Sequence, residues 1–215
     1  VVPIDPIDDL PHHQASSLVE QWQFDFWSQE HDLGGWTHFT YDHGSRKAWY
    51  VTALLGVDRR LVLVVDPKIP IPQLSQYLEF RAEGIWAQHV CETPLEHWTV
   101  GLEAFGVTLE TAEDAMGNQW GKRTGVGLDL EWERIDDPEI SGRGFSQRCS
   151  VSGEVLIDEE AIDLHVEGWR SRSWGVDLGL VDHPTGNGIH IDVGGIVLTV
   201  EPDFTGQQWG GHLSR

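Results

Sequence analysis

The sequence has few basic residues, little cysteine and no long apolar run, and each shortage excludes a class of protein. Fourteen lysines and arginines against 35 aspartates and glutamates give a net charge of −21. We therefore expect no nucleic-acid partner and no binding to anionic membranes, because positive charge dominates both interactions. The longest apolar run, residues 61–65, is far shorter than the roughly 20 residues of a membrane-spanning helix.

Cysteine is too scarce for a disulfide framework. Cys91 and Cys149 are the only two, so at most one bridge can form, and the lack of a CxxC pair excludes a zinc ribbon. The first residues lack the basic and apolar regions of a signal peptide, so we expect a cytoplasmic protein. At 40% hydrophobic residues the chain has ample material for a packed core.

Short segments in which apolar and polar residues alternate make up most of the chain. From Gly35 to about Glu201 this period of two dominates over helical patterns. About ten such segments at spacings of about 8 to 12 residues predict an all-β antiparallel barrel or sandwich with little helix. Hairpins are expected over residues 48–65 and 145–169. Further strands are expected over 36–41, 84–91, 96–102, 104–110, 126–132, 174–180, 189–193 and 196–201.

Other segments predict interruptions of the sheet. Pro67, Pro70 and Pro72 should break it, because proline cannot donate a ladder hydrogen bond. Residues 74–81 fit either a helical turn or the start of a strand, and residues 111–124 are typical of a long loop.

No repeat or linker divides the chain. Residues 1–20 contain three prolines and four acidic residues, and a short aromatic cluster follows at residues 22–27. We therefore expect an extended lead-in over residues 1–34 and a single β-barrel domain over 35–215.

Tryptophan is unusually frequent, with eleven residues. Many occupy alternating positions of the expected strands, which predicts an aromatic-lined cavity for an apolar or polycyclic molecule. The alternative is that the indole rings simply fill a wide barrel. The expected ligand-binding residues are Trp36, Trp49, Trp86, Trp98, Trp132, Trp169 and Trp174.

Histidines are the second group with chemical potential. His38, His89, His97 and His165 fall inside expected strands, where each is either a general acid or base on a cavity wall or an ordinary hydrogen-bonded or surface side chain. His190 and Asp192 share a strand face without an evident third ligand, so we expect no bound metal. The chain also lacks GxSxG, HExxH, Walker A and strand-linked GxGxxG motifs, and we expect no cofactor.

One stretch, residues 145–178, resembles the carotenoid-hydratase and AttH-like lipocalin (calycin) superfamily. There a glutamine precedes a hairpin with a glycine, and a Gly-x-Arg-Asp-His-Ser-Trp-Gly motif follows. The matching positions here are Gln147, Gly153, Gly168, Arg170, Ser173, Trp174 and Gly175. The resemblance implies a lipocalin-like barrel, usually two in tandem, around an apolar small molecule, in relatives that include hydratases, cyclases and pericyclases.

The chain departs from that pattern at two positions. The family's Asp-His pair is Ser171-Arg172 here, and neither residue can supply a proton as an aspartic acid does. Arg172 then either pairs with an acidic neighbour or donates to a ligand carbonyl. Acid-initiated hydration through this motif is therefore not expected.

Two classes of function remain. The first is a cofactor-free cyclase or isomerase, including Diels-Alder-type pericyclases, or a hydratase-like enzyme, acting on a polyketide or terpenoid intermediate; His97 and Arg172 are its expected catalytic residues. The second is a non-catalytic carrier of a hydrophobic small molecule, or a subunit of a larger complex. The length of 215 residues is short for two barrels, which favours a homodimer or a partner subunit.

Overall fold

The protein is almost entirely β-structure. The computed structural model describes residues 4–12, 18–71, 78–116, 120–141, 144–175, 189–193, 196–202 and 209–214, with side chains up to residue 175. The strands are β1 (Val19–Ser28), β2 (Leu33–Asp42), β3 (Lys47–Leu55), β4 (Val62–Pro70), β5 (Leu78–Ala82), β6 (Ile85–Thr93), β7 (His97–Leu109), β8 (Gly121–Arg134), β9 (Glu139–Ser141), β10 (Gly144–Ile157), β11 (Glu160–Gly175), β12 (Ile189–Val193), β13 (Ile196–Pro202) and β14 (Trp209–Ser214).

Helix is limited, over the described ranges, to two single 3-10 turns, η1 (Pro6–Asp9) and η2 (Ala112–Met116). No helix within these ranges has the length and apolarity needed to cross a membrane.

Eleven strands form one antiparallel sheet that closes on itself. The order is β4-β3-β2-β1-β11-β10-β8-β7-β6-β5, with β9 beside β10, and a pairing of β4 with β7 closes the ring. The all-β antiparallel fold with little helix is therefore confirmed, and it is consistent with a lipocalin-like barrel. Strands β12, β13 and β14 form a separate three-stranded sheet.

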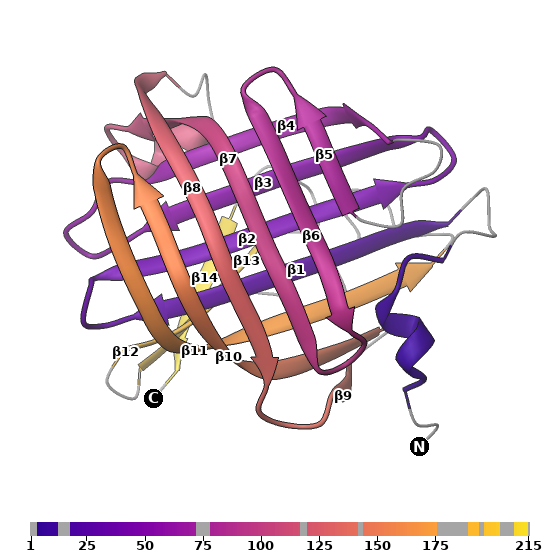
Figure 1. Ribbon diagram of the computed structural model, residues 1–215. Coiled ribbons are helices and arrows are strands. Elements are labelled where there is room, and N and C mark those ends of the chain that lie inside the picture. Colours follow the sequence, from indigo (N-terminus) through magenta and orange to yellow (C-terminus); the bar gives the residue numbers. More distant parts are fainter. Residues whose placement is uncertain are drawn as a thin grey trace.

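The ring has two crossing layers. Figure 1 shows β1–β4 running behind β5–β8, with β10 and β11 bending from one layer into the other. Residues 160–167 of β11 pair with β10 alone, whereas from Gly168 onward β11 also pairs with β1. A Cβ atom on Gly168 would lie 2.6 Å from the Asp25 carbonyl oxygen and 2.7 Å from the Trp132 ring. Glycine is therefore required where β11 joins the layers.

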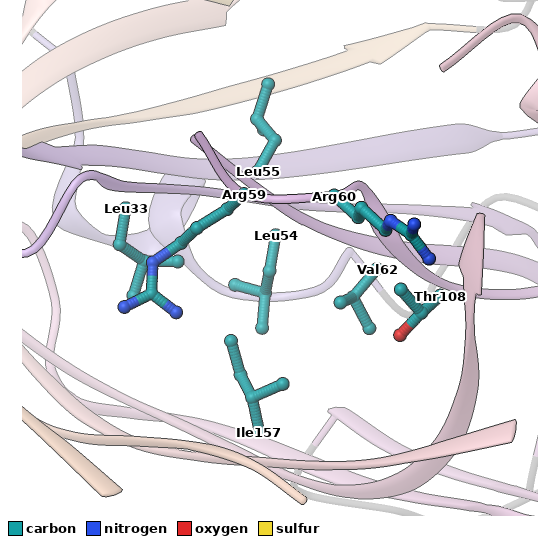
Figure 2. Close-up of a pocket in the computed structure, with 8 residues that line it drawn as sticks. All are labelled: Leu33, Leu54, Leu55, Arg59, Arg60, Val62, Thr108 and Ile157. Carbon is teal, nitrogen blue, oxygen red and sulfur yellow. The ribbon is translucent and has the colours of Figure 1, made fainter. Parts of the chain in front are cut away.

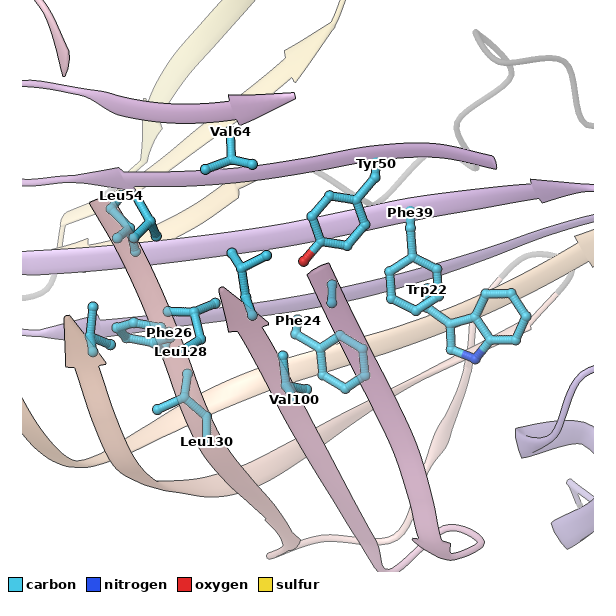
Figure 3. Close-up of a cluster of buried hydrophobic side chains, with 14 of the residues drawn as sticks. Trp22, Phe24, Phe26, Phe39, Tyr50, Leu54, Val64, Val100, Leu128 and Leu130 are labelled. Atoms are coloured by element: carbon cyan, nitrogen blue, oxygen red, sulfur yellow. The ribbon is translucent and has the colours of Figure 1, made fainter. Parts of the chain in front are cut away.

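The space between the layers is filled by apolar side chains. Alternate residues of each strand point inward, and Figure 3 shows the rings of Trp22, Phe24 and Phe39 in the same space as aliphatic side chains of the other layer, such as Val100 and Leu130. These positions follow the alternation read from the sequence. The core is therefore a packed interior, as is usual for folded domains.

Three local expectations are wrong. The sheet does not break at Pro67 and Pro70, because both lie within β4. The register with β3 shifts there, from Tyr50 opposite Asp66 to Ala48 opposite Ile69, so an irregularity absorbs the missing donor.

The other two concern β7 and β1. The segments expected as two strands, 96–102 and 104–110, form the single strand β7. Residues 19–28, expected within the lead-in, form β1 in the middle of the sheet. The alternating aromatic residues at 22–27 were the signal for this strand.

The remaining expectations are largely met. Both hairpins are present, and the expected loop over 111–124 contains η2 and the start of β8. Pro72, residues 176–180 and the turn at Gly194–Gly195 lie outside the described residues.

Candidate functional site

The outer face of β1 is polar although it is largely buried. Trp22, Phe24 and Phe26 enter the core from the inner face. Because side chains alternate along a strand, Gln21, Gln23 and Asp25 point to the opposite side.

The neighbouring strands continue this face in register. Gln23 lies between Ser171 of β11 and His38 of β2. Asp25 lies between Trp169 and Trp36 in the same way. In the third row, Gln21 lies between Ser173 and Thr40. We call these nine residues of β11, β1 and β2 the outer polar face.

Five of its polar residues are buried, each with no more than 5% of its surface exposed: Gln21, Gln23, His38, Thr40 and Ser173. Three hydrogen bonds join polar side chains within the face. Ser173 Oγ donates to Gln21 Oε1 at 3.2 Å, Gln23 Nε2 donates to Asp25 Oδ2 at 3.1 Å, and His38 Nε2 lies 3.1 Å from Thr40 Oγ1. Buried polar groups are stable only when hydrogen-bonded in this way.

Three buried N–H donors on this side of the sheet lack a hydrogen-bond acceptor among the described residues. Among the described residues, none accepts a hydrogen bond from the Gln21 amide nitrogen or from the indole nitrogens of Trp27 and Trp36. An unsatisfied buried donor costs about 1–3 kcal/mol. The face therefore offers N–H groups to an acceptor.

Asp25 is the titratable centre of the face. Burial raises the pKa of its carboxyl to about 7, and the hydrogen bond from Gln23 only partly offsets this. An acid with a pKa near neutrality holds and releases a proton at physiological pH, which is the property of a general acid or base.

Aromatic and aliphatic side chains flank the polar residues. The rings of Trp36 and Trp49 both lie next to the His38 ring, at centroid distances of 5.7 and 5.4 Å. An apolar cluster around Val51 and Leu63 continues the same side of the sheet onto β3 and β4. The arrangement suits a mostly apolar molecule that carries a polar group.

The three-stranded sheet lies on this side of the ring. The backbone of β12 passes close to that of β1, and Figure 1 shows β12–β14 behind the layer of β1–β4. The outer polar face therefore looks toward the small sheet.

The predicted catalytic residues lie elsewhere. The side chain of His97 points outward from β7, partly exposed, and pairs with Glu131 of β8. Arg172 points inward from β11 and is buried against Glu20, with its guanidinium 3.8 Å from the Trp22 ring centre. Neither residue reaches the outer polar face.

Arg172 belongs to a buried charge network. Glu20 accepts hydrogen bonds from Arg172 and from the backbone N–H of His12, and its carboxylate lies 2.5 Å from His43 Nε2. Burial acts to raise the pKa of Glu20, but His43, Arg172 and His12 together lower it to about 2. Pairing of Arg172 with an acidic neighbour was one of the two readings of the sequence.

Arg170 forms a second network that the sequence did not reveal. Its guanidinium donates to both carboxylate oxygens of Asp9, at 2.6 and 3.0 Å, and to Gln147. Asp9 is fully buried and also accepts from the Trp98 indole at 3.0 Å. The motif residues Gln147 and Arg170 thus fasten the amino-terminal segment to the ring.

The predicted tryptophans do not form the wall of one cavity. Trp36, Trp49 and Trp169 lie on the outer side of β2, β3 and β11, whereas Trp98 and Trp132 are buried in the core. Trp86 is 41% exposed, and Trp174 lies beside His12. These tryptophans therefore lie on both sides of the sheet and, in the described part of the chain, do not line one interior chamber.

His89 is an unusual member of that core. It is fully buried and its ring stacks on Phe39 at a centroid distance of 4.9 Å. Neither ring nitrogen has a hydrogen-bond partner among the described residues. Burial lowers the pKa of His89 to about 3, so the ring is neutral at physiological pH.

Among side chains that the structure describes, no three of His, Cys, Asp and Glu are grouped to hold a metal ion. The side chains of His190 and Asp192 lie outside the described ones. Cys91 and Cys149 are both free thiols.

Comparisons with known proteins give a family but no activity. Curated protein sequences contain no match. Two solved structures, CghA with Sch210972 and CghA, are 12% and 11% identical, with TM-scores of 0.41 and 0.43. The alignments cover 92% of this chain and 57% and 58% of CghA, so the chain spans less than two thirds of the length of these structures. The model of a domain of unknown function, DUF7064, matches residues 5–177; the chain therefore belongs to the DUF7064 family.

Proposed function

We propose that this chain is a cofactor-free cyclase or isomerase whose substrate, an apolar polyketide or terpenoid intermediate, binds against the outer polar face. The observation that carries the proposal is the juxtaposition of Asp25 and Gln23 of β1 with His38 and Trp36 of β2. A carboxyl group that titrates near neutrality lies there beside indole rings and unsatisfied N–H donors.

The chemistry proposed is proton transfer within one bound molecule. The protonated carboxyl of Asp25 donates its proton to an alkene carbon or a carbonyl oxygen of the substrate. The resulting carboxylate then takes a proton from another carbon, so a double bond moves or a ring closes and no atom is gained or lost. Such an acid accelerates a reaction by about 10²–10⁴-fold.

The other residues of the face hold the substrate. The Trp36 and Trp49 rings supply apolar surface, and the Gln21 amide N–H offers a hydrogen bond to a substrate carbonyl as negative charge develops on it. Confining a flexible chain in its reactive conformation lowers the barrier further. Pericyclic ring closure needs only this confinement, so the proposal includes it.

The experiment is a two-stage screen. Polyenes, steroids and polyketides are first tested for quenching of tryptophan fluorescence, and each ligand found is then incubated and analysed by chromatography. We expect an isomer of the same mass to form. The Asp25→Asn variant should slow its formation at least 100-fold with binding nearly unchanged, while Asp163→Asn, at an exposed carboxyl of β11, should match the wild type.

A carrier is the alternative on the same face. The apolar cluster of β3 and β4 next to it suits storage of a hydrophobic ligand as well as catalysis. Tight binding without any product would show the carrier, and equal rates in the Asp25→Asn and wild-type proteins would remove Asp25 from the chemistry.

A further inference from the structure

A cavity lies at the end of the ring opposite the amino-terminal segment. Its volume is about 240 Å³, and its lining includes Leu54, Arg59, Arg60, Thr108 and Ile157. Strand β7 connects the two ends of the ring: Trp98 near its start contacts Asp9 of the amino-terminal segment, whereas Thr108 near its end lines the cavity. Figure 2 shows Leu54 and Ile157 facing each other across the cavity, from β3 and β10.

The turn that carries the two arginines is held in place by Asp32. Its carboxylate accepts hydrogen bonds from the backbone N–H groups of Val57 and Asp58, both at 2.8 Å. A Cβ atom on Gly56 would lie 2.1 Å from the Asp32 carbonyl oxygen, so only glycine fits there. The positions of Arg59 and Arg60 are therefore built into the fold.

The two arginines differ in how firmly they are bound. Arg59 donates to both carboxylate oxygens of Glu160, at 2.8 and 2.7 Å, and to the His31 carbonyl oxygen. This bidentate pair joins the β3–β4 turn to the β10–β11 turn beside the cavity. Among the described residues Arg60 pairs only with Glu110, and the two side chains are 60% and 68% exposed.

An exposed pair such as Arg60–Glu110 is weak, because water screens the attraction between the two charges. A carboxylate that is held by other contacts can therefore take the place of Glu110 on Arg60. Such a carboxylate is otherwise repelled by a chain with a net charge of −21, so the arginine rim is the part of this cavity that selects for an anion.

We infer that this cavity binds a short amphipathic carboxylate, with its hydrocarbon tail between Leu54 and Ile157 and its head group on Arg60. Drug-sized ligands occupy pockets of about 300–1,000 Å³, so a cavity of about 240 Å³ fits a tail of about eight carbons. The site is separate from the outer polar face and needs no proton transfer, so it goes beyond the proposed function.

The test is an NMR titration of the methyl groups of Leu54 and Ile157 with octanoate, 1-octanol and acetate. Octanoate should bind at least tenfold more tightly than either of the other two, which lack the charge or the tail. The Arg60→Gln variant should lose about tenfold in affinity for octanoate and none for 1-octanol. Arg134→Gln, at the other end of the ring, is the matched control and should bind octanoate like the wild type.

Two variants test the location. Ile157→Trp and Thr108→Trp, at two half-buried residues that line the cavity, should each fill it and abolish octanoate binding. Equal affinity for octanoate and 1-octanol, or no effect of Arg60→Gln, would overturn the inference that Arg60 binds a carboxylate head group. Undiminished binding in both tryptophan variants would overturn the site. Asp25→Asn should leave octanoate affinity unchanged, which separates this result from the fate of the proposed enzyme.

Discussion

At the scale of single residues, the molecule keeps several polar groups where apolar ones would be more stable. Burial raises the pKa of Asp25 and lowers the pKa of His89, and both shifts favour the neutral form of the side chain. Neither strengthens the fold, since a buried group without adequate partners lowers stability. Asp25 lies on the outer polar face, where the proposed proton transfer requires a group that titrates near neutrality.

Asp25 makes stability depend on pH in a defined direction. Its pKa rises from 3.8 to about 7 on folding, so the folded state holds a proton that the unfolded state releases between these values. Stability should therefore fall as pH increases from about 4 to 7. Urea unfolding of Asp25→Asn should give a free energy about 1–3 kcal/mol above wild type at pH 8, and no gain at pH 3.5. An equal gain at both pH values would contradict the raised pKa.

His89 predicts the opposite dependence. Its pKa falls from 6.5 to about 3 on folding, so stability should be lost as pH decreases from about 6.5 toward 3. His89→Phe removes both unsatisfied nitrogens and keeps an aromatic ring against Phe39. We expect its free energy of unfolding to exceed that of the wild type by about 1–2 kcal/mol at pH 7 and by more at pH 5. His165→Phe, at an exposed position of β11, is the control; if His89→Phe is less stable than wild type, the ring has a partner.

At the scale of elements, the alternation of apolar and polar residues predicted where the strands lie, but not which side of each strand faces the interior of the ring. The inward residues of β8, from Val126 to Trp132, are buried as the pattern indicates. The pattern alone does not say which side of a strand faces the interior of the ring. Trp36 and Trp98 therefore looked equivalent although they lie on opposite sides of the sheet. Asp9 could not be found, because its partner Arg170 lies 161 residues away.

The bend of β11 depends on one glycine. A methyl group on Gly168 would approach the Asp25 carbonyl oxygen, Trp132 and Val151 to within 2.6–2.8 Å. We expect Gly168→Ala to destabilise the fold by about 1–3 kcal/mol, measured by thermal unfolding. Gly125→Ala, whose Cβ would meet nothing closer than 3.8 Å, should be nearly neutral. Equal effects of the two substitutions would show that close packing at the bend is unimportant.

At the scale of the whole molecule, two buried charge networks connect the amino-terminal segment to the ring. Asp9 pairs with Arg170, and Glu20 with Arg172 and His12. The low pKa of Glu20, about 2 against 4.5, stabilises the fold above about pH 4.5, and this contribution disappears as pH falls toward 2.

Removing one partner of the buried Glu20–Arg172 pair should lower the free energy of unfolding more than removing both partners. Glu20→Gln leaves the buried Arg172 without its carboxylate, so we expect a loss of about 3–5 kcal/mol in urea unfolding. Glu20→Gln combined with Arg172→Met should recover part of that loss, because no charge then remains buried. A double variant at least as unstable as the sum of the single ones would mean that the two side chains are not coupled.

The family match covers residues 5–177 and thus both ion-pair networks and the outer polar face. The sequence predicted the all-β fold and, as one of two alternatives, the pairing of Arg172 with an acidic neighbour. It named Trp36, Trp49 and Trp169 as lining a cavity inside the barrel, but their side chains lie on the outer side of the sheet. It could not place the site outside the ring, since that depends on which layer each strand joins and on how β11 connects the layers.

The most direct test of the central claim is ¹⁹F NMR of the protein with all eleven tryptophans replaced by 5-fluorotryptophan, each signal assigned by substitution. A ligand from the fluorescence screen is then titrated in. Binding at the outer polar face predicts that the signals of Trp36 and Trp49 shift while those of Trp98 and Trp132 do not. Shifts of Trp98 and Trp132 with Trp36 and Trp49 unmoved would place the ligand inside the ring and contradict the account.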